Sequence, residues 1–167
     1  MPILIETNTV SIRRAGQHDK IALWHIHTSA VREILSKYYT PREIRQWLGS
    51  LRPEGYEYSI ESKECVVAEY RGKVIGFGQM DCKNALIEAI YVLPDYVRRG
   101  IGTKILHTLE GKAMGSGVTA LQLCSSLYAV PFYENAGFKA QLNIHHQLPD
   151  GTMLPCIYMI KKLLSSP

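Results

Sequence analysis

The sequence predicts one mixed α/β domain with elements in the order β-α-α-β-β-β-α-β-α-β-β. Three observations support this fold class. The chain has 167 residues, close to the length of one ordinary domain. Hydrophobic residues make up 46% and charged residues 20%, as in globular proteins. The apolar pattern changes from helical spacing near the N-terminus to short β-prone runs. We expect residues 1–167 to form a single domain, with a mixed central sheet of about seven strands flanked by about four helices.

The N-terminal third is expected to contain one strand and two helices. Residues 10–13 alternate apolar and polar side chains, which is typical of a strand. Residues 17–36 carry apolar side chains at helical spacing. Thr40 and Glu43 have the spacing of a capping box, which predicts a second helix over residues 40–51. A loop should follow it.

The remainder of the chain is expected to be β-rich, with two further helices. Glycine-containing turns at residues 71–73 and 149–151 predict two hairpins. The expected elements are strands over 64–70, 74–81 and 85–92, a helix over 100–114, a strand over 118–124, a helix over 128–135, and strands over 138–148 and 153–161.

Composition and charge exclude several classes of protein. The formal net charge is +4, but the basic residues are scattered, so we do not expect a nucleic-acid-binding protein. The sequence contains no run of eighteen apolar residues, so no membrane span is predicted. The N-terminus has no basic segment followed by a long apolar one, which favours a cytoplasmic protein.

The cysteines and histidines do not predict a metal site. Cys65, Cys82, Cys124 and Cys156 include no C-x-x-C pair, and each lies in or beside an apolar stretch. We therefore expect buried structural thiols. The neighbouring histidine pairs have no third ligand nearby in the sequence, so no metal is expected.

A glycine-rich segment after a predicted strand has the features of an anion site. A helix N-terminus presents unpaired N–H groups, and glycines let an anion approach the main chain. The spacing fits neither a P-loop nor a dinucleotide-binding fingerprint. A glycine-rich helix start without a ligand is the alternative. The residues of this segment are Val97, Arg98, Arg99, Gly100, Ile101, Gly102 and Thr103.

A second segment, some thirty residues further on, reads Phe132-Tyr133-Glu134-Asn135-Ala136-Gly137-Phe138. Alone, it could be an ordinary packed helix. Together, the two segments resemble the GCN5-related N-acetyltransferases (GNAT superfamily), and the order of elements resembles that family over essentially the whole domain. The family's loop reads Q/R-x-x-G-x-G/A, so Val97 departs from it. The second segment matches the family's F-Y-E-x-x-G-F signature.

The resemblance implies acetyl-CoA as the cosubstrate. Backbone amides of the glycine loop would bind the CoA pyrophosphate, and the backbone of Ile90, Tyr91 and Val92 would pair with the pantetheine arm. Ser126 stands where many relatives have a CoA-contacting Asn. Relatives that dimerise suggest a homodimer through the β-rich C-terminal half.

The expected reaction is acetyl transfer to a primary amine of a small molecule or peptide, by direct attack in a ternary complex. An alkylamine, with a pKa of roughly 10.4, must first lose a proton. By resemblance to the family, whose bases often lie on the fourth strand, Glu88 is the preferred base, with Asp81 or a water chain as alternatives. By resemblance, Tyr133 would protonate the leaving thiolate.

The acceptor is expected between the first two helices and the closing hairpin. The candidate residues there are Trp24, His27, Tyr38, Tyr39, Trp47, His145 and His146, and for both tryptophans helical spacing favours core packing over a substrate role. Two other hypotheses remain open: a non-catalytic acyl-CoA-binding sensor on the same fold, and a nucleic-acid-associated protein.

Overall fold

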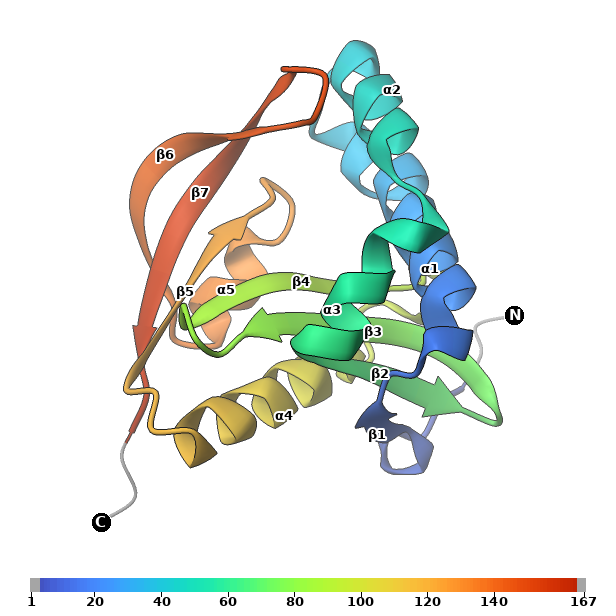
Figure 1. Cartoon of the computed structure of the whole chain (residues 1–167), viewed down its shortest axis with the longest axis vertical. Coiled ribbons are helices and arrows are strands. Elements are labelled where there is room, and N and C mark those ends of the chain that lie inside the picture. The colour runs from blue at the N-terminus through green and yellow to red at the C-terminus, as the bar shows by residue number, and fades with distance from the viewer. Residues whose placement is uncertain (1–3, 165–167) are drawn as a thin grey trace.

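A computed structural model describes residues 4–164, so the first and last three residues of the expected domain lie outside it. One mixed sheet has the strand order β1-β2-β3-β4-β5-β7-β6 (Figure 1). The strands are β1 (Ser11–Arg14), β2 (Glu64–Tyr70), β3 (Lys73–Asp81), β4 (Leu86–Val92), β5 (Ala120–Ser125), β6 (Lys139–Gln147) and β7 (Met153–Lys162). The predicted seven-stranded sheet is confirmed, with strand ends shifted by no more than two residues.

The helices cover both faces of the sheet. They are α1 (Lys20–Glu33), α2 (Pro41–Ser50), α3 (Glu57–Ser62), α4 (Ile101–Gly115) and α5 (Val130–Asn135). In Figure 1, α4 lies against one face of β2–β4, and α1 and α3 lie on the other. The capping box that starts α2 is confirmed, because Thr40 Oγ1 accepts a bond from the Glu43 amide and Glu43 accepts one from the Thr40 amide.

Helix α3 corrects the prediction of a loop after the second helix. It has only six residues, of which Ser59 and Ile60 are buried. A helix of about one and a half turns is too short for apolar residues to recur at helical spacing, so the sequence pattern does not predict α3. The described part of the chain therefore has five α-helices where about four were expected.

Helix α4 packs very closely on the middle of the sheet. A Cβ atom at Gly78 in β3 would overlap the side chain of Ile105. Ile105, Leu106 and Leu109 are fully buried at this contact. The close approach fixes the start of α4 relative to the end of β4, and this relationship defines the cavity described below.

The sheet splits between its two parallel strands. β4 and β5 pair only at Leu86↔Gln122 and Ile87↔Leu123, and all other neighbouring strands are antiparallel. Beyond these pairs the strands diverge, and the β5 side of residues 88–92 has no strand partner. Figure 1 shows α5 beside β5 in the resulting opening.

The cysteines are only partly as expected. Cys65 and Cys156 are buried, and Cys82 is partly buried. Cys124 is exposed, so the expectation of a buried thiol is wrong there. Cys124 pairs with Tyr158 of β7 but lies one position beyond the last residue of β5 that pairs with β4.

Candidate active site

A cavity of about 500 Å³ lies where β4 and β5 diverge. Its walls come from the end of β4, the start of α4, the α5 region and the C-terminal end of α1. It brings together ten residues singled out in the sequence: Ile90, Tyr91, Val92, Val97, Arg98, Gly100, Gly102, Thr103, Ser126 and Tyr133. Arg99, Ile101 and Glu88 do not line it. The strand end, the glycine segment and the tyrosine therefore face one space.

The loop before α4 is held in an unusual backbone conformation. Arg98 has φ +60° and Gly100 has φ +79°, both in the left-handed region. A non-glycine residue there is uncommon and costs backbone strain. Gly100 is the N-cap of α4, and the buried Ile101 fixes the first turn to the core. The first N–H groups of a helix lack intrahelical acceptors, so this turn presents hydrogen-bond donors of the kind that can bind an anion.

Tyr133 is a buried tyrosine whose hydroxyl remains available. Its ring packs edge-on against Phe132 and Phe138, with centroid distances of 5.0 and 5.6 Å. Within residues 4–164, no side-chain hydrogen bond engages its hydroxyl. Burial raises the pKa of Tyr133. The side chain is therefore a protonated donor at the cavity wall at neutral pH.

Ser126 has a local structural contact as well as a place in the cavity wall. Its Oγ accepts a hydrogen bond from the Ala129 amide at 3.3 Å. This bond shapes the turn that leads into α5. The hydroxyl hydrogen is still free to turn toward the cavity, because accepting a bond uses only an oxygen lone pair.

Glu88 is engaged by two neighbouring side chains. Lys63 Nζ and Gln79 Nε2 both donate hydrogen bonds to its carboxylate. An irregularity in the pairing of β3 with β4, between Gln79 and Met80, lies opposite Glu88. Its role as the base stays a prediction, with Lys63 as an ion-pair partner.

Asp81, the alternative base, belongs to the turn between β3 and β4. Its carboxylate accepts bonds from the Asn84 amide and side chain, at 3.2 and 2.8 Å. These hydrogen bonds hold the pKa of Asp81 below its usual range. Lys63 Nζ lies 4.0 Å from Asp81, so one lysine faces both candidate bases.

The region expected to bind the acceptor is largely filled by core. Tyr39 and Trp47 pack with Val31, Leu35 and the hairpin residues Leu148 and Leu154 in a second hydrophobic cluster. The structure therefore corrects the expectation of an open cleft between the first two helices and the hairpin. Of the other candidates, Trp24 donates to the Leu51 carbonyl, Tyr38 lines the cavity, and His145 and His146 are exposed on β6.

His27 belongs to an aromatic cluster next to the cavity. Its ring stacks on Tyr91 at a centroid distance of 4.1 Å, and its Nδ1 lies 2.8 Å from the Tyr56 hydroxyl. Its Nε2 is buried without a hydrogen-bond partner in the described structure. Burial lowers the pKa of His27 to about 3, so the ring is neutral. Through Tyr91, this neutral cluster supports the cavity wall.

Sequence reasoning missed part of the cavity wall. Tyr128 lines it and contacts Tyr38 edge-on at 5.4 Å, so two aromatic rings meet across the opening. Ala30 and Ile34 of the α1 region also line it. Tyr128 is near the matched motif, but the α1 contribution depends on a contact across the fold that no local pattern indicates.

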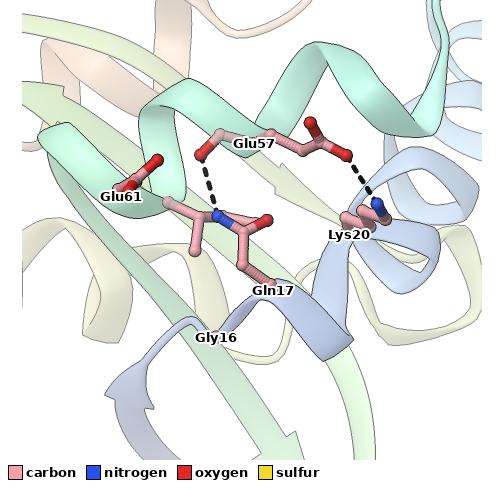
Figure 2. A pocket seen from close by; sticks show the side chains of 6 residues that line it. Gly16, Gln17, Lys20, Glu57 and Glu61 are labelled. Atoms are coloured by element: carbon pink, nitrogen blue, oxygen red, sulfur yellow. Dashed lines mark hydrogen bonds and ion pairs between the residues drawn. The ribbon is translucent and has the colours of Figure 1, made fainter.

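A second hollow, of about 570 Å³, lies on the surface between α3 and the start of α1 (Figure 2). Gln17 Nε2 donates to the Glu57 carbonyl at 3.0 Å, and Lys20 Nζ pairs with the Glu57 carboxylate at 2.6 Å. These contacts attach α3 to the N-terminal half of the molecule. Gln17, Lys20 and Glu57 are thus already used in joining two elements (Figure 2).

The described residues contain no group of three His, Cys, Asp or Glu side chains able to hold a metal ion. None of the helices described is long and apolar enough to cross a membrane.

The fold is thus an α/β class in which a mixed sheet splits beside a glycine-opened helix and leaves a cavity between the diverging strands. The model of the acetyltransferase (GNAT) domain matches residues 35–148. The chain belongs to the GNAT family, as the sequence motifs predicted.

Several known proteins are similar to this chain in sequence or in fold. The uncharacterized N-acetyltransferase YafP of Escherichia coli is 26% identical over 132 residues, covering 79% of this chain and 83% of that protein. A GCN5-related N-acetyltransferase from Rhodopseudomonas palustris has a TM-score of 0.88 at 22% identity, covering 96% of this chain and 99% of that one. The PaiA N-acetyltransferase of Thermoplasma acidophilum, solved with coenzyme A, has a TM-score of 0.77 at 18% identity, with coverages of 92% and 99%.

Proposed function

We propose that this protein transfers the acetyl group of acetyl-CoA to a primary amine of a small molecule or a peptide, by direct attack in a ternary complex. The observation that carries the proposal is the cavity between β4 and β5, because it joins an anion site, an open strand edge and a free tyrosine hydroxyl. These are the three kinds of group that a CoA thioester and its leaving thiolate require.

The two ends of the cofactor would be held by backbone groups. The pyrophosphate would lie on the N–H groups at the start of α4, around Gly100 and Gly102, with Arg98 adding positive charge. The pantetheine amides would pair with the open edge of β4 at Ile90–Val92, as an added strand does. The coenzyme A bound to the Thermoplasma relative supports this choice of ligand.

Protons move at two residues in the proposed reaction. Glu88, directly or through a water molecule, takes a proton from the attacking ammonium, so that the neutral nitrogen can bond to the acetyl carbon. As the carbon–sulfur bond breaks, Tyr133 donates its proton to the thiolate, and the second proton that the nitrogen loses on becoming an amide restores the tyrosine hydroxyl, directly or through water. A backbone N–H of β4 would stabilise the carbonyl oxygen, and such a donor is typically worth ~3 kcal/mol.

One observation favours a second candidate, a non-catalytic acyl-CoA sensor. Glu88 lies outside the cavity wall and is paired with Lys63. A sensor needs the CoA site but no base. Both candidates predict CoA binding, and only the enzyme predicts that turnover depends on Glu88 and Tyr133.

The experiment that tests the proposal is a thermal-shift titration with acetyl-CoA, CoA, ATP and NAD. Ligand at a hundred times its Kd stabilises a protein by about 2.7 kcal/mol, or roughly 5–10 °C for a chain of this size. A shift with acetyl-CoA and CoA alone supports the CoA site, and an amine panel assayed by thiol release then tests turnover. No shift with either CoA compound at millimolar concentration would reject both candidates.

A further inference from the structure

The N-terminal segment lies directly behind the glycine loop. Thr7 sits in a short 3-10 turn (Thr7–Thr9), ninety-two positions before the loop residue it contacts. Its Oγ1 donates a hydrogen bond to the Arg99 carbonyl at 3.0 Å. Lys104, in the first turns of α4, donates to the Thr7 carbonyl at 3.3 Å and to the Val10 carbonyl. The segment and the loop are therefore tied together from both sides.

The bond from Thr7 fixes the direction of one peptide group. The described chain has no cis peptide bonds, so the Arg99 carbonyl and the Gly100 N–H point in opposite directions. The carbonyl points at Thr7, which does not line the cavity. Gly100 does line the cavity, and its N–H points away from Thr7. This N–H has no backbone acceptor in the described structure.

We propose that Thr7 is a positioning residue for CoA binding, which holds the Arg99–Gly100 peptide with its N–H toward the pyrophosphate. The inference rests on the proposed function, since it assumes that the ligand of the glycine loop is CoA. Thr7 acts through the peptide and does not touch the ligand.

The loop needs this external contact because its own residues allow the Arg99–Gly100 peptide group to flip. Gly100 at φ +79° has no Cβ to restrict rotation, and Arg98 at φ +60° is in a strained conformation. Rotation of the peptide would replace a donor with a carbonyl oxygen at the anion site. An oxygen facing a pyrophosphate is repulsive, so both a hydrogen bond and the local charge complementarity would be lost.

The test compares Thr7→Val, Thr7→Ser and Thr9→Val. Valine keeps the shape of threonine but removes the hydroxyl, and serine retains it. Thr9 is a matched control, because its Oγ1 donates only to the Glu6 carbonyl within the same turn. Calorimetry measures the Kd of CoA and of S-acetylpantetheine, which lacks the pyrophosphate.

We expect Thr7→Val to weaken CoA binding about tenfold, which corresponds to about 1.4 kcal/mol. Thr7→Ser and Thr9→Val should stay within about twofold of the wild type. None of the three should change the affinity for S-acetylpantetheine. In the thiol-release assay, Thr7→Val should raise the KM for acetyl-CoA and leave kcat unchanged.

Two results would overturn the inference and leave the proposed function intact. One is equal CoA affinity in Thr7→Val and the wild type. The other is an equal loss of affinity for CoA and S-acetylpantetheine, which would indicate general loosening. If Thr7→Val does not fold, Thr7→Ala carries the same expectation. Failure of the wild type to bind CoA would instead reject the proposed function.

Discussion

Lys63 donates a hydrogen bond to the carboxylate of Glu88, so the proposed general base is already paired with a positively charged nitrogen. The ammonium group of an acceptor must compete with Lys63 for the same oxygen atoms. Gln79 holds the second oxygen, which fixes the orientation of the carboxylate. The base is thus positioned by its neighbours before the substrate arrives.

Replacing Glu88 separates the enzyme from the sensor. We expect Glu88→Gln to lower kcat by about 100-fold or more, because the amide cannot accept the proton of the ammonium. CoA affinity should be unchanged, since Glu88 does not line the cavity. The matched control is Glu61→Gln, an exposed residue of α3. Steady-state rates of thiol release measure the effect, and unchanged kcat would exclude Glu88 as the base.

The hydroxyl of Tyr133 is expected to act only on the leaving group. Tyr133→Phe keeps the aromatic packing with Phe132 and Phe138, so the melting temperature should change little. Loss of the proton donor should lower kcat by about 100-fold. Tyr158→Phe is the control, because that hydroxyl donates to Gln122 away from the cavity. Equal effects of the two substitutions on kcat would contradict the acid role.

Alanine substitutions at two glycines of α4 should affect two different properties, CoA affinity at Gly102 and folding stability at Gly111. A Cβ at Gly102 would meet the Phe132 ring at 3.4 Å, beside the anion site. Gly102→Ala should therefore weaken CoA binding about tenfold or more by blocking approach to the main chain. Gly111→Ala, later in α4 with no atom within 4 Å of the new Cβ, should raise stability by about 0.5–1 kcal/mol.

Calorimetry and denaturant unfolding of both variants measure these changes. Similar CoA affinities for the two variants would show that the start of α4 does not bind the pyrophosphate. A stability gain at Gly111 without any change in CoA affinity is the expected control result.

His27 should make stability fall in mild acid. Its pKa is lowered to about 3 in the folded protein, whereas an unfolded histidine has a pKa of about 6.5. Between these values the unfolded chain binds one more proton. Stability is therefore fully present above about pH 6.5 and decreases by up to about 1.4 kcal/mol per pH unit as the pH falls toward 3.

Urea unfolding at pH 7.5, 6 and 5 measures this slope. His27→Phe should make the dependence shallower, since phenylalanine cannot bind the proton in either state. His25→Phe provides the same substitution at an exposed position of α1 and should keep the wild-type slope. If the wild type and His27→Phe lose stability equally as the pH falls, the assignment of this acid destabilisation to His27 is refuted.

Most of the fold was predictable because its signals are local. The capping box of Thr40 and Glu43 defines the start of α2, and alternation and turn residues define the strands. The glycine loop was predictable for the same reason, since Gly100 and Gly102 open a helix a few residues after the β-prone run of β4. The resemblance to the GNAT family also implied that Tyr133 faces the same site, and it lines the same cavity.

The missed features depend on contacts between distant segments. Helical spacing favours a core position for Trp47, but the burial of Tyr39 arises where α1 and α2 meet the hairpin tip at Leu148 and Leu154, which no local pattern indicates. The pairing of Lys63 with Glu88 joins residues twenty-five positions apart. The contact of Thr7 with Arg99 has no counterpart in any local pattern.

The short parallel ladder between β4 and β5 has a consequence for cooperativity. Only two residue pairs connect the backbone of β1–β4 to that of the β5-β7-β6 unit, so side-chain packing carries most of this junction. The two units can therefore open with different free energies, as separate regions of amide protection. A ligand in the cavity contacts β4 and α4 on one side and α5 on the other. Its binding would therefore couple the two into a single cooperative unfolding unit.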